Sequence, residues 1–194
     1  MKTLVAKAQN GDAQAFEELV VIYQDRLYAL CYRLSGSHAD AQDLAQEAFV
    51  RAYRALHKFR QEADFGTYLH RIAVNLWLSY RKRNHNEVSL DDPVVTGEGE
   101  LPRQVAGNDR HPEQMLEETE YRALVRESLA VLAREHRVVL ILREMEDFSY
   151  EEIAATLGVA PGTVKSRLSR AREALKKAVC TLAKQKGLDL PGMN

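Results

Sequence analysis

A proline-containing, acidic segment in the middle of the chain is the feature that most limits how these 194 residues can fold. Residues 84–117 contain two basic and eight acidic side chains, together with three of the chain's five prolines, Pro93, Pro102 and Pro112. A segment with few apolar residues and many like charges cannot bury enough surface to offset the entropy lost on ordering. We therefore expect a flexible acidic linker at 84–117, between separate domains at 1–83 and 118–194.

Both flanks show the periodicity of helices. Each has about 80 residues, which is enough for a small bundle but not for a large core. Apolar residues recur there three and four positions apart, and no long stretch alternates as a strand does. The helices expected from this spacing and from capping residues such as Asp12 and Ser37 cover residues 12–36, 37–56, 65–83, 115–132, 138–142, 149–158 and 161–183. The sequence predicts an all-α protein of two small helical domains.

The overall composition excludes several classes of protein. Hydrophobic residues make up 45% of the chain and charged residues 28%, as in soluble globular proteins. No apolar run approaches the length of a membrane-spanning helix, so we expect no membrane insertion. The first residues lack the apolar core of a secretory signal, and the two cysteines, Cys31 and Cys180, form no disulfide framework. We expect a cytoplasmic location.

Residues 149–172 have the features of a helix-turn-helix. Ser149 and Glu152 form a capping box, Gly158 ends the short helix that follows, and Pro161 suits the first position of a second helix. This second helix is basic, and its N-terminal part would enter the major groove of DNA. The candidates for contacts to base edges and phosphates are Thr163, Lys165, Ser166 and Arg167, and the basic face continues through Arg170 and Arg172. The alternative is an ordinary solvated amphipathic helix.

A second basic helix, at 65–83, carries aromatic residues. Arg71 and Arg81 are among its cations, and no acidic residue lies between Phe65 and His85. Tyr68, Trp77 and Tyr80 are interleaved with these cations. Aromatic rings among cations suit unpaired DNA, whose bases stack on rings. The equally weighted alternative is that the rings belong to the core and the cations to a solvated helix end.

The helix at 37–56 carries acidic residues on one stripe. Asp40, Asp43 and Glu47 share a face through their spacing of three and seven positions, Gln46 lies beside them and Phe49 follows. Carboxylates cannot face DNA phosphates, so this stripe suits a basic protein partner. Taken alone, a solvated face near a helix N-terminus explains it as well.

Motifs of catalysis are missing from the sequence. There is no phosphate-binding Walker loop, no GxSxG or HExxH, and no Cys and His at metal-binding spacing. We therefore expect no enzyme activity and no cofactor.

The order of these pieces resembles a bacterial sigma factor of the sigma-70 family, in its extracytoplasmic-function (ECF) group. Residues 40–53 resemble the family helix that docks on the β′ clamp helices of RNA polymerase. Residues 65–75 resemble the segment that opens and reads the −10 promoter element, although Tyr68 stands where a Trp is usual. Residues 140–154 and 162–172 resemble the domain that reads the −35 element. The linker matches no motif.

The resemblance implies a transcription initiation factor with a region 2-like bundle and a region 4-like helix-turn-helix domain. Its partners would be core RNA polymerase, through the β′ clamp helices and the β flap, promoter DNA and an anti-sigma factor. The polymerase contacts implied are Asp40, Asp43, Gln46, Glu47 and Phe49. The −10 contacts implied are Arg60, Asp64, Arg71, Asn75 and Arg81, with the loop 60–64 holding a flipped base. The −35 contacts are Thr163, Lys165, Ser166, Arg167, Arg170 and Arg172. The alternative function is a stand-alone helix-turn-helix regulator.

Overall fold

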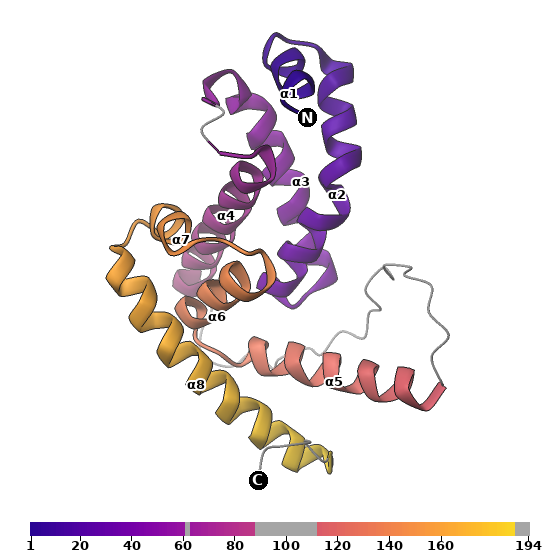
Figure 1. Cartoon of the computed structure of the whole chain (residues 1–194), viewed down its shortest axis with the longest axis vertical. Coiled ribbons are helices and arrows are strands. Elements are labelled where there is room, and N and C mark those ends of the chain that lie inside the picture. Colours follow the sequence, from indigo (N-terminus) through magenta and orange to yellow (C-terminus); the bar gives the residue numbers. More distant parts are fainter. Residues whose placement is uncertain (61–62, 88–111, 189–194) are drawn as a thin grey trace. The chain divides into compact units, whose positions relative to one another are not determined.

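A computed structural model describes residues 1–60, 63–87 and 112–188, and for residues 80–87 and 112–119 it describes the helical backbone without the side chains (Figure 1). The chain divides into two compact units, residues 1–99 and 100–194. Every regular element among the described residues is helical, which confirms the expected all-α class. The helices α4 and α5 take up both ends of the predicted linker, because α4 ends at Glu87 and α5 begins at Pro112. Residues 88–111 lie outside the described residues.

Four helices and a short 3₁₀ turn build the first unit. They are α1 (Lys2–Gln9), α2 (Ala13–Ser35), α3 (His38–Ala55), η1 (Leu56–Lys58) and α4 (Phe65–Glu87). The predicted caps are confirmed: the Asp12 carboxylate accepts a hydrogen bond from the Ala15 N–H at 3.1 Å, and Gly36 ends α2 with a φ of +77°. The Ser37 hydroxyl accepts from the Asp40 N–H at 3.4 Å and begins α3.

The core of this unit lies where α2 packs on α3 and α4 (Figure 1). Leucines of α2, among them Leu19, Leu27 and Leu30, are completely buried there. The inner face of α3 carries small residues such as Ala48 and Ala52, which are also completely buried. Small side chains allow the backbones of two helices to approach closely. The acidic stripe of α3 therefore stands on a rigid support.

The second unit is built from α5 (Pro112–Ala130), α6 (Arg134–Leu140), a π-helical turn η2 (Ile141–Met145), α7 (Tyr150–Leu157) and α8 (Pro161–Lys186). The predicted capping box is confirmed, with the Glu152 N–H 3.1 Å from the Ser149 hydroxyl oxygen and the Ser149 N–H 2.8 Å from the Glu152 carboxylate. Gly158 ends α7 with a φ of +65°, and Pro161 opens α8. Ile153, Val164 and Leu168 are buried between these helices and fix α8 against α7.

Two elements were not expected. The helix α1 has only eight residues, too few for a clear periodicity. The π-helical turn η2 continues directly from α6 and leads to Asp147. Among the described non-glycine residues, Asp147 is the one with a positive φ, +57°. No sequence pattern used above distinguishes a π turn from a continuing α-helix.

Candidate DNA and polymerase interfaces

The predicted −35 residues lie together on the first half of α8. Lys165 and Arg170 are exposed, and neither forms an ion pair with another described residue. Thr163 and Ser166 are half-buried, and the Ser166 hydroxyl donates to the Thr163 carbonyl oxygen at 2.9 Å. A hydroxyl bound to its own helix can still accept from a ligand. This part of α8 therefore offers two unpaired cations beside two hydroxyl groups.

The other two arginines of the predicted −35 set are already paired within the unit. The Arg167 guanidinium lies 3.6 Å from the Glu135 carboxylate of α6, and its side chain is 28% exposed. The Arg172 guanidinium donates twice to one Glu144 carboxylate oxygen, at 2.6 and 3.1 Å, and this contact raises the pKa of Arg172. Both pairs are solvent-accessible, and such pairs contribute only about 0–1 kcal/mol. DNA phosphates can therefore compete with these carboxylates for the two arginines.

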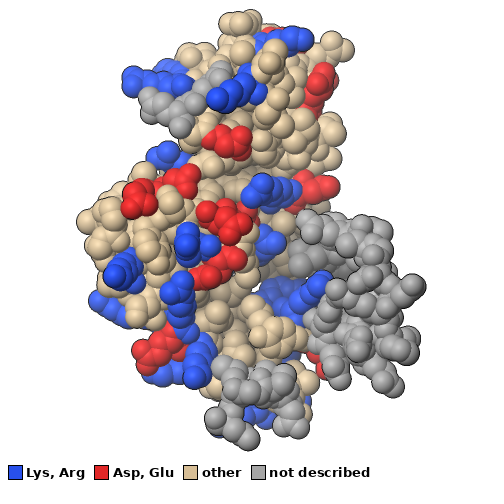
Figure 2. Space-filling view, viewed as in Figure 1, with Lys and Arg blue, Asp and Glu red and all other residues tan. Residues whose placement is uncertain are grey.

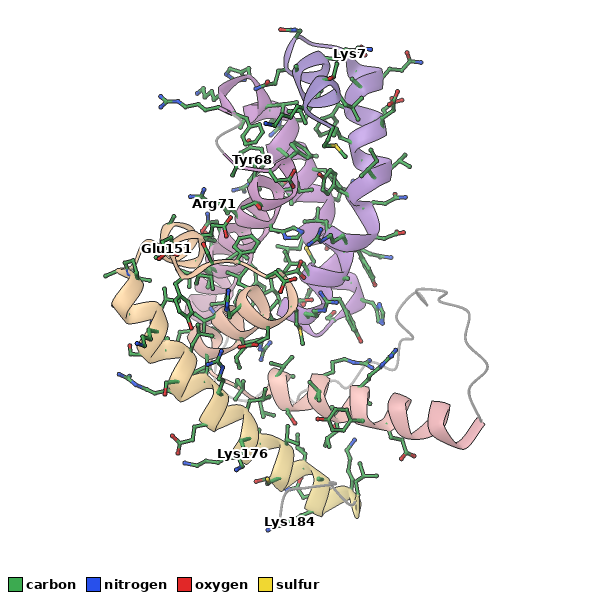
Figure 3. The ribbon with its side chains drawn as sticks, viewed as in Figure 1. Lys7, Tyr68, Arg71, Glu151, Lys176 and Lys184 are labelled. Atoms are coloured by element: carbon green, nitrogen blue, oxygen red, sulfur yellow. The ribbon has the colours of Figure 1, made fainter. Side chains whose placement is uncertain are left out.

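The basic aromatic helix α4 divides its aromatic residues between the core and the surface. Trp77 is only 3% exposed, so of the two interpretations of this ring the core residue holds and stacking on DNA bases does not. Tyr68 is half-buried on α4, where Figure 3 labels it together with Arg71, and its ring stacks on Phe59 with centroids 4.5 Å apart. The side chains of Tyr80 and Arg81 lie outside the described residues.

The remaining predicted −10 residues lie in the segment just before α4 and along the first three turns of this helix. Arg60 and Asn75 are exposed, whereas Arg71 is half-buried. Asp64 caps the helix, because its carboxylate accepts from the Gly66 N–H at 2.8 Å and its carbonyl accepts from the Tyr68 N–H at 3.0 Å. Residues 61–62 of the predicted base-binding loop 60–64 lie outside the described residues.

Gly66 lets the Asp64 carboxylate and the Tyr23 ring come close to the backbone at the start of α4. A Cβ atom at Gly66 would lie 2.9 Å from the Asp64 carboxylate and 2.9 Å from the ring of Tyr23. Burial is the main cause that raises the pKa of Tyr23, and the negative charge of Asp64 raises it further. The close approach of the Tyr23 ring requires a residue without a side chain at position 66, and the sequence alone does not reveal it because Tyr23 lies on another helix.

The acidic stripe of α3 forms the rim of a cavity. Asp40, Asp43 and Glu47 line a space of about 300 Å³ between α3 and α4. The buried side chains of Leu44, Leu76 and Trp77 form its apolar floor, and Arg51 pairs with Glu47 at 2.7 Å. An apolar floor with an acidic rim fits a basic, amphipathic partner segment. Spacing along one helix predicts the rim but not this floor, because Leu76 and Trp77 come from another helix.

Three of the five predicted polymerase contacts line this cavity, and the other two do not. Gln46 is exposed and Phe49 is half-buried, and neither lines the cavity. Tyr53, one turn after Phe49, contacts Phe16 of α2 with ring centroids 4.8 Å apart. Residues four positions apart lie on the same face of a helix, so Phe49 belongs to the side of α3 that meets α2. Gln46, three positions after Asp43, lies next to the acidic rim, whereas Phe49 lies farther around α3.

His70 is a buried polar residue that the sequence did not single out. It is 2% exposed, and burial, together with the nearby charges of Arg26 and Arg33, lowers its pKa to about 4. Asp64 acts in the opposite direction but more weakly than burial and Arg26. The imidazole is therefore neutral at neutral pH.

One face of the described surface mixes charges of both signs. On the face drawn in Figure 2, basic and acidic side chains alternate over the surface, and neither sign forms one continuous field. Long-range attraction of DNA needs a coherent basic surface.

None of the described helices has the length and apolar character needed to cross a bilayer. Within the described part of the chain, no group of three His, Cys, Asp or Glu could hold a metal ion.

Comparisons with known proteins agree with this arrangement. Residues 5–87 match the family described as Sigma-70 region 2, and residues 122–175 match Sigma-70, region 4. The chain is 35% identical over 178 residues to the ECF RNA polymerase sigma factor SigW of Bacillus subtilis. The matched residues cover 91% of this chain and 95% of the relative. This chain is 37% identical over 185 residues to the ECF RNA polymerase sigma-E factor of Escherichia coli K12, covering 95% and 96% of the two chains.

A solved structure gives the same assignment. The sigma factor RpoE of Bartonella quintana, determined in complex with the anti-sigma factor NepR, is similar with a TM-score of 0.65 and 25% identity over 86% of this chain and 98% of the other. The two family regions occur in the expected order, one in each compact unit. The chain belongs to the sigma-70 family of RNA polymerase sigma factors, in its ECF group, and acts as a transcription initiation factor that directs the polymerase to promoters.

Proposed function

We propose that the two units divide promoter recognition between them, the first docking on core RNA polymerase and reading melted −10 DNA, and the second reading −35 duplex DNA. The observation that carries this proposal is that one chain contains both an acidic-rimmed cavity between α3 and α4, called the docking cavity below, and a basic helix-turn-helix formed by α7 and α8. The acidic rim cannot bind DNA phosphates and the basic helix can. The two surfaces therefore require different partners.

Polymerase docking would use the cavity between α3 and α4. Asp43 and Glu47 are exposed and would pair with cations of the β′ clamp helices, while Leu44 and Leu76 would receive an apolar side chain. Apolar anchors surrounded by a charged rim are the usual construction of a specific interface. Asp40 completes the acidic rim. Gln46 and Phe49, which lie outside the cavity, would contact the edge of the partner.

Recognition of the −10 element would use the start of α4 and its exposed face. Arg60, Arg71 and Arg81 would bind phosphates of the melted strand, and the amide of Asn75 would bind a base edge. The loop 60–64 would take one flipped base, with the Asp64 carboxylate as a hydrogen-bond acceptor. Extracting a base from the stack costs a few kcal/mol, which these contacts must return.

Recognition of the −35 element would use the N-terminal part of α8. Lys165 and Arg170 are available to phosphates without breaking a described ion pair, and Thr163 and Ser166 offer hydroxyl groups. Arg167 and Arg172 would exchange Glu135 and Glu144 for DNA. A bidentate Arg–guanine contact discriminates by about 1–3 kcal/mol.

The segment between the units is long enough for one chain to hold both promoter elements. The 24 residues from 88 to 111, between α4 and α5, could extend to about 80 Å, whereas DNA sites one to two helical turns apart need about 35–70 Å. The net charge of −6 over residues 84–117 would keep the segment away from duplex DNA and would suit a polymerase channel built for RNA. The alternative is an inert tether.

Three further properties follow from the family. The Bartonella quintana relative was solved with an anti-sigma factor, and we propose that this chain has such a partner, which would cover its docking and DNA-binding surfaces. We propose that the chain works in the cytoplasm, where its polymerase is. We propose that it has no catalytic activity and no cofactor of its own.

One experiment tests the proposal against the alternative function, a stand-alone helix-turn-helix regulator. Purified chain is mixed with core polymerase, passed over a sizing column and assayed in run-off transcription from a promoter template. The proposal predicts co-elution with core and discrete transcripts that core alone does not make. A regulator would instead bind duplex DNA tightly without polymerase and would not co-elute.

A further inference from the structure

Two carboxylates from outside the helix-turn-helix lie against its second helix, α8. Glu135 belongs to the first turn of α6, and Glu144 belongs to the π-helical turn η2. The Glu135 carboxylate lies 3.6 Å from the Arg167 guanidinium, and one oxygen of Glu144 accepts two hydrogen bonds from Arg172, at 2.6 and 3.1 Å. Both arginines belong to the predicted −35 contacts, whereas neither acid belongs to a predicted contact with DNA or polymerase.

The core of the second unit holds the two acids in place. The helix α6 packs on α8, and η2 continues directly from α6. Val139 of α6, Ile141 and Leu142 of η2, and Ala171 of α8 are completely buried. Because the backbones that carry the acids and the arginines are both anchored in this core, the two ion pairs are part of the fold of the unit.

The pairs neutralise half of the positive charge on the DNA-binding part of α8. Residues 161–172 contain four cations and no acid. Among the described residues, Lys165 and Arg170 form no ion pair, whereas Arg167 and Arg172 each face a carboxylate. Nonspecific DNA binding comes almost entirely from cations that meet phosphates. An arginine that must first leave a carboxylate exchanges one anion for another and contributes less to this binding.

We infer that Glu135 and Glu144 are affinity-setting residues, internal anions that occupy Arg167 and Arg172 in the free chain and so weaken its binding to duplex DNA. The inference rests on the proposed function, in which α8 is the DNA-binding helix of the second unit, and it assigns a role to two acids outside that helix. The weakening applies to every DNA sequence, because the pair must open before either a phosphate or a guanine can take its place. In the complex with polymerase, the other promoter contacts would offset it.

The two acids should not contribute equally. Glu144 accepts from both Nε and Nη2 of Arg172, which form one of the guanidinium edges that bind phosphate or guanine with two parallel bonds. Glu135 lies 3.6 Å from Arg167, beyond the usual hydrogen-bond distance, and its side chain is 57% exposed. Glu144 is therefore the stronger competitor with DNA.

The test measures binding of the full-length free chain to a random-sequence duplex at about 50 mM salt, by fluorescence anisotropy. Glu144→Gln keeps the shape of the side chain but removes its charge. We expect it to raise the affinity about two- to fivefold, as the loss of one exposed ion pair allows, and Glu135→Gln to give a smaller rise. Glu173→Gln is the matched control, because this acid of α8 pairs with Lys177, 2.8 Å away, and not with a predicted −35 residue. It should leave the affinity nearly unchanged.

A double variant shows whether Glu144 acts through Arg172. In an Arg172→Gln background, Glu144→Gln should have no further effect, because no guanidinium is left to be released. An equal rise with and without Arg172 would mean that the carboxylate repels DNA directly, and would overturn the inference. Unchanged affinity of Glu144→Gln in the otherwise wild-type chain would overturn it too. So would a lower affinity, which is expected if the carboxylate instead holds Arg172 ready for DNA.

Lys165→Gln distinguishes failure of this inference from failure of the proposed function. Lys165 is an exposed cation on the same part of α8, so its loss should lower duplex affinity if this helix binds DNA. A loss in Lys165→Gln without a rise in Glu144→Gln would overturn the inference alone. Unchanged affinity in both variants would show that α8 is not the DNA-binding helix, and the proposed function would fail with the inference.

Discussion

Gly66 is the residue that permits close packing at the start of α4, beside the predicted −10 loop. Its missing side chain leaves room for the Tyr23 ring and the Asp64 carboxylate, each 2.9 Å from where a Cβ would lie. We expect Gly66→Ala to lower the free energy of unfolding by about 1–3 kcal/mol, because the buried Tyr23 ring would have to shift and the Asp64 carboxylate would have to leave its bond from the Gly66 N–H. Urea denaturation measures this change. Gly162→Ala is the control, since nothing lies within 4 Å of its Cβ position. Equal behaviour of the two variants would contradict the close packing.

His70 gives the first unit a defined dependence on pH. Its pKa of about 4 in the folded state lies below the ordinary value of 6.5, so the folded chain binds fewer protons between these values. Its contribution to stability is therefore complete above pH 6.5 and is lost as the pH falls toward 4, by up to about 3 kcal/mol.

We expect His70→Gln to show a flatter decline in the free energy of unfolding between pH 6.5 and 4 than the wild type. The exposed histidine His57 provides the control variant, His57→Gln, which should follow the wild-type curve. Urea denaturation at half-unit pH intervals measures the difference. Parallel curves for wild type and His70→Gln would show that this imidazole does not titrate differently in the folded state.

At the scale of helices, the capping box holds the helix-turn-helix. Ser149→Ala removes the acceptor of the Glu152 N–H, and we expect it to cost about 1 kcal/mol. Thermal melting of the full chain measures the loss. The loss should be about the same in Glu152→Ala and should not double in the double variant, because each residue acts on the other's backbone. Full additivity would mean that the two bonds are independent.

The recognition helix should separate DNA reading from polymerase binding. Arg167→Ala is expected to weaken −35 binding by about 1–3 kcal/mol while core polymerase binding stays unchanged. Lys184→Ala removes one exposed cation from the far end of the same helix, where Figure 3 labels it, and should leave −35 affinity nearly intact. Affinity is measured by fluorescence anisotropy with the polymerase-bound chain on promoter duplex. Equal loss of DNA and polymerase binding in Arg167→Ala would refute its assignment.

Local patterns predicted the helices better than the sites. Caps such as Ser37 and the capping box of α7 act within one turn, so the residues that form them are adjacent in the sequence. The docking cavity and the Tyr23–Gly66 contact join residues from different helices, and no spacing within one helix can reveal them. Trp77 illustrates the same limit, because its place on α4 did not tell whether it faced the core.

For the whole molecule, polymerase binding should depend on the acidic rim of the first unit. Asp43→Arg places a cation where the cations of the partner are expected, and like charges at an interface cost several kcal/mol. We expect at least about a tenfold loss of core affinity. Asp25→Arg is the matched control, an exposed acid on α2 that does not line the cavity. Isothermal titration with core polymerase distinguishes the two, and unchanged affinity of Asp43→Arg would count against the docking site.

The two flanks carry net charges of only +3 (residues 1–83) and +2 (residues 118–194), so we expect the free chain to bind DNA weakly and its specificity to emerge only in the complex with polymerase. Run-off transcription on one promoter template, with core polymerase alone and with core plus purified chain, tests this most directly. The account predicts a discrete transcript only when both are present, which disappears when the −10 or the −35 sequence is scrambled. A transcript pattern identical to that of core alone, on templates carrying its promoters, would contradict it.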